Sequence, residues 1–156
     1  MATQYLEQLY DEVPLFKTRL VEEDRVSFSN REEVKCPDSI AALLQEYFAD
    51  KDREETLLVL LDINKTCIGL SQLSIGGLSE ATLEPQQIFK AAILGNADTI
   101  ALAHNHPSGN PKPSSGDIEV TRQISDAGEV MDVPLVDHLI VTRDEGYTSM
   151  ARCGYL

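Results

Sequence analysis

Residues 103–117 constrain this chain more than any other stretch, because two histidines one residue apart precede a loop with three prolines. His104 and His106 follow the short apolar run 99–103, which has the composition of a buried strand. Side chains at positions i and i+2 of a strand point to the same face, so both imidazoles can be directed at one point. Pro107 then ends the strand, because it has no backbone N–H for the ladder.

The loop ends at a predicted helix start, where Ser114 precedes Asp117 by three residues. Asp117 would lie in the first helical turn and could face back toward the histidines. Two histidines and one aspartate suit a catalytic zinc whose fourth position stays open to water. The same pair also fits a capping box, in which Ser114 caps the helix and the acid reaches back. Both roles are compatible, because a carboxylate has two oxygens.

This pattern resembles the JAMM motif of the JAB/MPN metalloprotease family, in which a glutamate is followed at a distance by H-x-H-x7-S-x-x-D. The run H-N-H-P-S-G-x-P-x-P-S with a later Asp-His pair is more similar to the RadC-like branch of that family. The resemblance covers roughly residues 38–156. It implies an α/β fold of the JAB/MPN-like (cytidine-deaminase-like) type, a mixed β-sheet flanked by helices. It also implies Zn²⁺ as the cofactor.

The resemblance further implies a glutamate at a strand start that moves protons without binding the metal. Glu54 and Glu55 both precede the apolar run 56–63, and the alternation of strand faces means that only one can point at the zinc. The family pattern favours Glu54 as the catalytic base, with Glu55 as the alternative. Ser114 is expected to help hold the oxyanion. His138 competes with Asp117 as third ligand, and the motif spacing favours Asp117.

The remaining elements follow from periodicity and from turn residues. A helix is expected from residues 37–39 to 50–53, a hairpin from strands 56–63 and 67–73, and a helix over 84–95. The helix from Ser115 is expected to run to about Ala127, with Gly128 as its stop. The strand 133–142 is expected to be interrupted at Asp137 and His138, and a short strand or turn follows over 146–149. Residues 75–77 form an expected flexible link.

We divide the chain into an N-terminal extension, residues 1–36, and a RadC-like JAB/MPN domain, residues 37–156. The extension could hold a strand within residues 15–28, and nothing in it suggests a catalytic role. Longer RadC proteins are expected to carry a helix-hairpin-helix segment upstream, and no such segment is visible here. RadC-like sequences also tend to show Pro-Arg-Glu where this chain has Pro85-Gln86-Gln87.

Charge and cysteine content limit the classes of partner and compartment. Thirteen basic and 26 acidic residues give a net charge of −13 without any basic cluster, which argues against tight direct binding to DNA. Cys36, Cys67 and Cys153 form no C-x-x-C pair and are expected to be reduced thiols rather than zinc ligands. No signal peptide and no apolar run of membrane-spanning length is visible, so a cytoplasmic location is expected.

Two classes of function are compatible with the sequence. The first is a zinc metallopeptidase that cuts a peptide or isopeptide bond of a protein substrate with a zinc-activated water. The second is an accessory or binding protein of DNA repair or mobile elements, in which the metal is structural or vestigial. The intact set of motif residues favours the first class, and the sequence does not identify the substrate.

Overall fold

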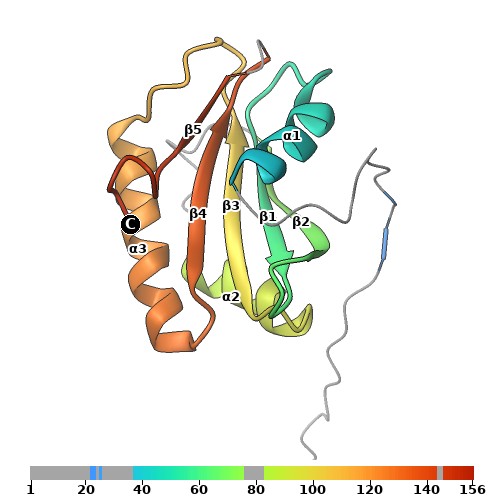
Figure 1. The fold of residues 1–156 in the computed structure, drawn as a ribbon, viewed down its shortest axis with the longest axis vertical. Helices are drawn as coiled ribbons and strands as arrows, with labels where there is room; N and C mark the ends of the chain where they lie inside the picture. The colour runs from blue at the N-terminus through green and yellow to red at the C-terminus, as the bar shows by residue number, and fades with distance from the viewer. Residues whose placement is uncertain (1–21, 24, 26–36, 76–82, 144–145) are drawn as a thin grey trace, which may run out of the picture.

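The computed structural model describes residues 22–23, 25, 37–75, 83–143 and 146–156, and they form a mixed α/β arrangement (Figure 1). Almost all of the extension, including most of the strand expected within residues 15–28, lies outside these ranges. Most of the expected link at 75–77 also lies outside them. Among the described helices, none combines the length and the apolar character needed to cross a membrane.

The described strands form one five-stranded sheet in the order β2-β1-β3-β4-β5. Their bounds are β1 Glu55–Leu61, β2 Cys67–Ile75, β3 Thr99–Asn105, β4 Leu135–Val141 and β5 Tyr147–Ser149. β3 and β4 are parallel, and every other neighbouring pair is antiparallel. The expected mixed sheet is therefore confirmed. The hairpin of β1 and β2 also forms as predicted, with Lys65 in its turn at a φ of 64°.

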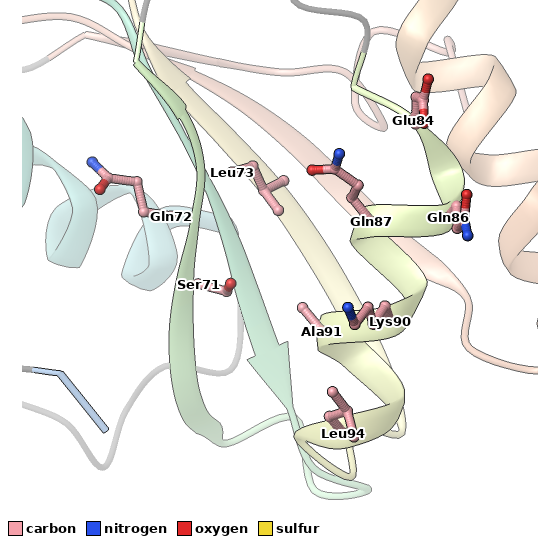
Figure 2. A pocket seen from close by; sticks show the side chains of 9 residues that line it. All are labelled: Ser71, Gln72, Leu73, Glu84, Gln86, Gln87, Lys90, Ala91 and Leu94. Carbon is pink, nitrogen blue, oxygen red and sulfur yellow. The ribbon is translucent and has the colours of Figure 1, made fainter. Parts of the chain in front are cut away.

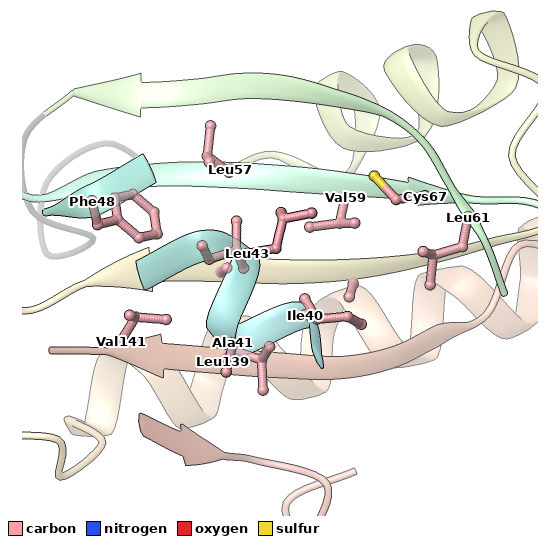
Figure 3. Packing of buried hydrophobic residues seen from close by; sticks show 13 residues of the cluster. Ile40, Ala41, Leu43, Phe48, Leu57, Val59, Leu61, Cys67, Leu139 and Val141 are labelled. Carbon is pink, nitrogen blue, oxygen red and sulfur yellow. The ribbon is translucent and has the colours of Figure 1, made fainter. Parts of the chain in front are cut away.

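Helices cover both faces of the sheet. α1, Pro37–Phe48, packs its buried face on one side against alternate residues of β1, β3 and β4 (Figure 3). α2, Pro85–Leu94, and α3, Ser115–Met131, pack on the other side. Because β1 and β3 are buried on both faces, residues 57–61 of β1 and 100–103 of β3 are continuously apolar rather than alternating.

Gly128 does not end α3, which corrects the prediction from the sequence. The helix continues to Met131, and Asp132 caps it in the left-handed conformation with a φ of 56°. A Cβ atom on Gly128 would lie 2.9 Å from the carbonyl oxygen of Val133. The glycine is therefore needed because the chain entering β4 passes close to the helix.

The expected interruption of the strand at Asp137 and His138 is also wrong. Both residues lie inside the continuous strand β4, and the irregularity comes earlier, where Leu135 pairs with Ile100 but Asp137 pairs with Ala101. This extra residue changes which face each later side chain occupies. As a result His138 points toward α3 and the histidine motif, on the same side of the sheet as Leu135.

Candidate metal centre

The candidate site forms where three parts of the chain meet, at the upper end of the sheet in Figure 1. His104 lies on β3 and His106 directly follows that strand, while Glu54 directly precedes β1. Because β1 and β3 are antiparallel and Thr56 pairs with His104, the start of β1 lies beside the end of β3. The loop after His106 crosses to α3, whose first turn carries Asp117.

Nitrogen and oxygen atoms of these side chains converge on one point. The Nε2 atoms of His104 and His106 are 2.9 Å apart. Asp117 Oδ1 lies 3.3 Å from His104 Nε2, and Asp117 Oδ2 lies 3.8 Å from His106 Nε2. Donor atoms around a tetrahedral zinc with bonds of about 2.0–2.1 Å are separated by about 3.3 Å. These distances are close to that spacing, so the three side chains are candidate ligands of one small cation.

Glu54 lies at the rim of the same cluster. Its Oε1 is 4.0 Å from His104 Nε2, and Glu54, His104 and His106 each offer a ligand atom within 4.8 Å of the others. These residues form a group that could hold a metal ion. The side chain of Glu54 is 25% exposed, whereas that of Asp117 is 1% exposed, so the two carboxylates meet different environments.

A chain of hydrogen bonds determines which nitrogen of His104 carries its proton. Thr121 Oγ1 lies 2.5 Å from the carbonyl oxygen of Asp117, which can only accept, so the hydroxyl donates there. The same hydroxyl oxygen, 2.7 Å from His138 Nδ1, then accepts the Nδ1–H of His138. His138 Nε2 is therefore unprotonated and accepts a hydrogen bond of 2.9 Å from the Nδ1–H of His104. His104 Nε2 therefore presents a lone pair to the cluster.

Burial keeps both histidines neutral, as this assignment requires. His104 and His138 are fully buried. Burial, followed by the charge of His106, lowers the pKa of His104 to about 3. Burial and then His104 hold the pKa of His138 well below its ordinary value, against the opposing effect of Asp117. Each ring thus carries a single proton at neutral pH.

His106 presents a second lone pair to the same point. Its Nδ1 is 2.7 Å from the carbonyl oxygen of Asn110, which can only accept, so this nitrogen donates there. In a ring with a single proton, Nε2 is then unprotonated. Two bare nitrogens 2.9 Å apart repel each other when no proton lies between them. A cation that accepts both lone pairs removes this repulsion, and the donor set therefore fits a metal ion.

Ser114 and Asp117 form the predicted capping box at the start of α3. The backbone N–H and the hydroxyl of Ser114 both donate to Asp117 Oδ2, at 2.6 and 2.7 Å. These bonds leave Oδ1 facing His104. Because a hydroxyl has one proton, Ser114 can donate to a substrate oxygen only by giving up its bond to Asp117.

Glu55 faces the opposite side of the sheet from Glu54. Its carboxylate lies 3.1 Å from Lys51 Nζ, and it accepts a hydrogen bond of 2.9 Å from Gln72 Nε2 and a longer one of 3.3 Å from Tyr47. The geometry therefore favours Glu54 over Glu55 as the acid that acts at the cluster, although a role as base stays a prediction.

His138 contacts the second nitrogen of His104 rather than the point where the Nε2 atoms meet, which does not support it as third ligand. The structure also adds two residues that the sequence analysis did not indicate. Thr121 was missed, although its position four residues after Asp117 places it on the same helical face. Asn105, between the two histidines, was missed because its partners are 50 and 52 residues away in the chain.

Comparison with known protein families identifies the family to which the chain belongs. Residues 34–155 match the model of the RadC-like JAB domain. The chain belongs to the RadC-like JAB domain family. The described fold and the histidine motif agree with this membership, as the resemblance predicted.

Relatives of this RadC-like JAB domain share about two residues in five with it. A UPF0758 protein of Desulfitobacterium hafniense is 40% identical over 123 residues, which are 79% of this chain and 54% of that protein. A UPF0758 protein of Salinibacter ruber is 40% identical over 138 residues, 88% of this chain and 58% of that protein. The chain therefore spans about half the length of the curated relatives it matches, and their name states no activity.

A pocket of about 450 Å³ opens beside the candidate metal site of this RadC-like JAB domain. Glu54, His106 and Ser114 form part of its wall. The loop between the motif histidines and α3 supplies the rest, namely Pro107, Ser108, Asn110, Lys112 and Pro113. A separate groove of about 440 Å³ lies between β2 and α2 and contains none of the cluster residues (Figure 2). The first pocket is therefore the one from which a substrate could reach the cluster.

Proposed function

We propose that this domain is a zinc-dependent metallopeptidase of the JAMM type that hydrolyses a peptide or isopeptide bond. One observation carries the proposal: two bare histidine nitrogens face each other beside two carboxylates, at the wall of an open pocket. His104, His106 and Asp117 would hold the metal. Three protein ligands of this kind are typical of catalytic rather than structural zinc. Zinc, when bound, supplies a Lewis acid and lowers the pKa of its water to about 7.

The two carboxylates suit different tasks because their surroundings differ. Asp117 is buried and its Oδ2 is held by two donors of Ser114, which leaves Oδ1 free to act as the proposed ligand. Glu54 lines the pocket and stays partly exposed. A general base must reach both the attacking water and the leaving nitrogen, so we assign Glu54 to take the proton and return it to the amine.

Ser114 is assigned two roles that compete for one proton. In the described geometry its hydroxyl donates to Asp117 and caps α3. Because Ser114 also lines the pocket, the hydroxyl could turn toward the oxyanion of a substrate. During that turn the backbone N–H of Ser114 would still hold Asp117 Oδ2.

The proposal is tested by metal content and by hydrolysis measured on the same preparations. Purified protein should hold about one zinc per chain, and the His104→Ala, His106→Ala double variant should lose it. Linear peptides and lysine-branched isopeptides are then incubated with the zinc-loaded protein, and cleavage is read by mass spectrometry. Cleavage in one pool that disappears in Glu54→Gln supports the proposal. Full zinc content in the double variant, or equal cleavage by wild type and Glu54→Gln, would contradict it.

A further inference from the structure

Asn105 lies between the two motif histidines but points away from the candidate metal site. It is 4% exposed, and neither nitrogen nor oxygen of its side chain is left without a partner. The ladder between β1 and β3 ends at the pair of Thr56 and His104. Beyond that pair, the side-chain amide of Asn105 takes the place of a backbone peptide group and continues the pairing by one step.

The amide of Asn105 binds both peptide groups that flank Glu54. Its Oδ1 accepts a hydrogen bond of 2.7 Å from the N–H of Glu55, and its Nδ2 donates one of 2.9 Å to the carbonyl oxygen of Arg53. Only one orientation of the amide satisfies both partners, because a donor must meet the carbonyl and an acceptor must meet the N–H. The two bonds therefore bracket the backbone of Glu54.

We propose that Asn105 is a positioning residue that holds Glu54 at its working distance from the metal ligands. This inference rests on the proposed role of Glu54 as the base. Asn105 is covalently bonded to His104 and His106, so its amide ties the base directly to the strand that carries the ligands. The position of a catalytic group matters because an error of about 1 Å can reduce the rate about 100-fold.

We call the two hydrogen bonds from the Asn105 amide to Arg53 and Glu55 the clamp. The first test measures this clamp directly and needs no substrate. In Asn105→Ala the Glu55 N–H loses its acceptor, so its hydrogen exchange, followed by NMR, should become about five- to tenfold faster. Exchange of the amides in the rest of β3 and zinc content should stay unchanged. The control is Asn64→Ala, the same substitution in the exposed turn after the other end of β1. Unchanged exchange at Glu55, or an equal rise along every strand, would overturn the local clamp.

The second test measures the consequence of the clamp for turnover. On a peptide cleaved by the wild type, Asn105→Ala should lower kcat about 10- to 100-fold with KM and zinc affinity unchanged. A loss of general structure would instead change zinc affinity and KM as well. Unchanged kcat in Asn105→Ala, together with an inactive Glu54→Gln, would overturn the positioning role.

A second variant keeps the test decisive if Asn105→Ala does not fold. Asn105→Asp has the same shape and keeps the acceptor for the Glu55 N–H, but it places an oxygen against the Arg53 carbonyl. Exchange at Glu55 should stay near the wild-type rate while kcat falls; wild-type kcat in this variant would count against the clamp. The Glu54→Gln variant tests the proposed function separately. If it turned over substrate at the wild-type rate, Glu54 would not be the base, and this conclusion would not depend on the exchange data.

Discussion

Glu54 and Glu55 are neighbours in sequence, yet they face opposite sides of the sheet, which gives them different partners. Glu54→Gln should keep zinc and the fold but abolish hydrolysis, because an amide cannot take a proton from water. Glu55→Gln should have a milder effect, since its carboxylate binds Lys51 and Gln72 on the opposite face. Zinc analysis, thermal unfolding and peptide cleavage on both variants check this prediction. An inactive Glu55→Gln beside an active Glu54→Gln would reverse the assignment.

His138 should act on the metal through His104. In His138→Leu the buried His104 Nδ1–H loses its acceptor, which should cost about 1–3 kcal/mol of unfolding free energy and reduce zinc affinity about 10- to 100-fold. His138→Gln still offers a carbonyl oxygen to His104, so its losses should be smaller. Urea unfolding of the metal-free protein and zinc titration against a chelator measure the two effects. Equal zinc affinity in both variants and the wild type would show that the contact is only packing.

The two roles assigned to Ser114 can be separated by substitution. Ser114→Ala should cost about 1 kcal/mol of stability as a lost cap, and the loss of an oxyanion donor should reduce turnover about 10²–10³-fold. Asparagine also caps helices well but would place its donor differently. Ser114→Asn should therefore keep near wild-type stability and remain strongly impaired in turnover, with zinc content unchanged in either variant. Turnover at the wild-type rate in Ser114→Asn would mean that Ser114 only caps α3 and does not hold the oxyanion.

The motif predicted that the candidate ligand side chains would meet, but not the contacts that orient them. His104, His106 and Asp117 follow from local rules of strand alternation and helix entry, which act over a few residues. The partners of His138 and Asn105 depend on which strands become neighbours, and their hydrogen bonds join residues 17 to 52 positions apart. Such contacts need the topology of the sheet, which spacing alone does not provide.

At the scale of elements, a tertiary contact at Gly128 explains why the predicted end of α3 was wrong. A glycine near the end of a helical pattern usually ends it, but here the close approach of Val133 requires it inside α3. Gly128→Ala should destabilise the protein by about 1–3 kcal/mol, because backbone atoms cannot move aside easily. Gly116→Ala is the matched control in the same helix, since its Cβ would meet Ser114 Oγ at an ordinary 3.7 Å.

Unfolding in urea compares the two glycine variants directly. The control should be neutral or slightly more stable, because alanine favours a helix more than glycine does. Equal stability of Gly128→Ala and the wild type would mean that β4 can shift away from α3.

The prediction of β4 failed for a similar reason. The polar pair Asp137 and His138 in an apolar run resembles a break, but both side chains are satisfied by tertiary partners. Asp137 accepts from the Ser149 hydroxyl at 2.6 Å and from its neighbour's backbone, while His138 joins the proton chain to Thr121. By contrast, α1, α2 and the β1–β2 hairpin were predicted to within a few residues, because their turn residues and periodicity agree with their burial.

At the scale of the whole molecule, charge limits which partners this chain can hold unaided. The chain carries a formal net charge of −13, and Lys112 is the one lysine or arginine among the residues that line the pocket beside Glu54 and His106. Tight contact with a phosphate backbone requires several basic side chains that release counterions on binding. We therefore predict that the purified chain will not hold duplex DNA at physiological salt.

Salt dependence distinguishes this prediction from weak association of any other kind. Fluorescence anisotropy of a labelled duplex is measured from low salt to ~150 mM. Without clustered phosphate contacts, little binding should be seen, and the affinity should depend only weakly on salt. A complex of micromolar or tighter affinity at ~150 mM, with a steep salt slope, would contradict the prediction. It would also favour the alternative function, an accessory protein of DNA repair or mobile elements.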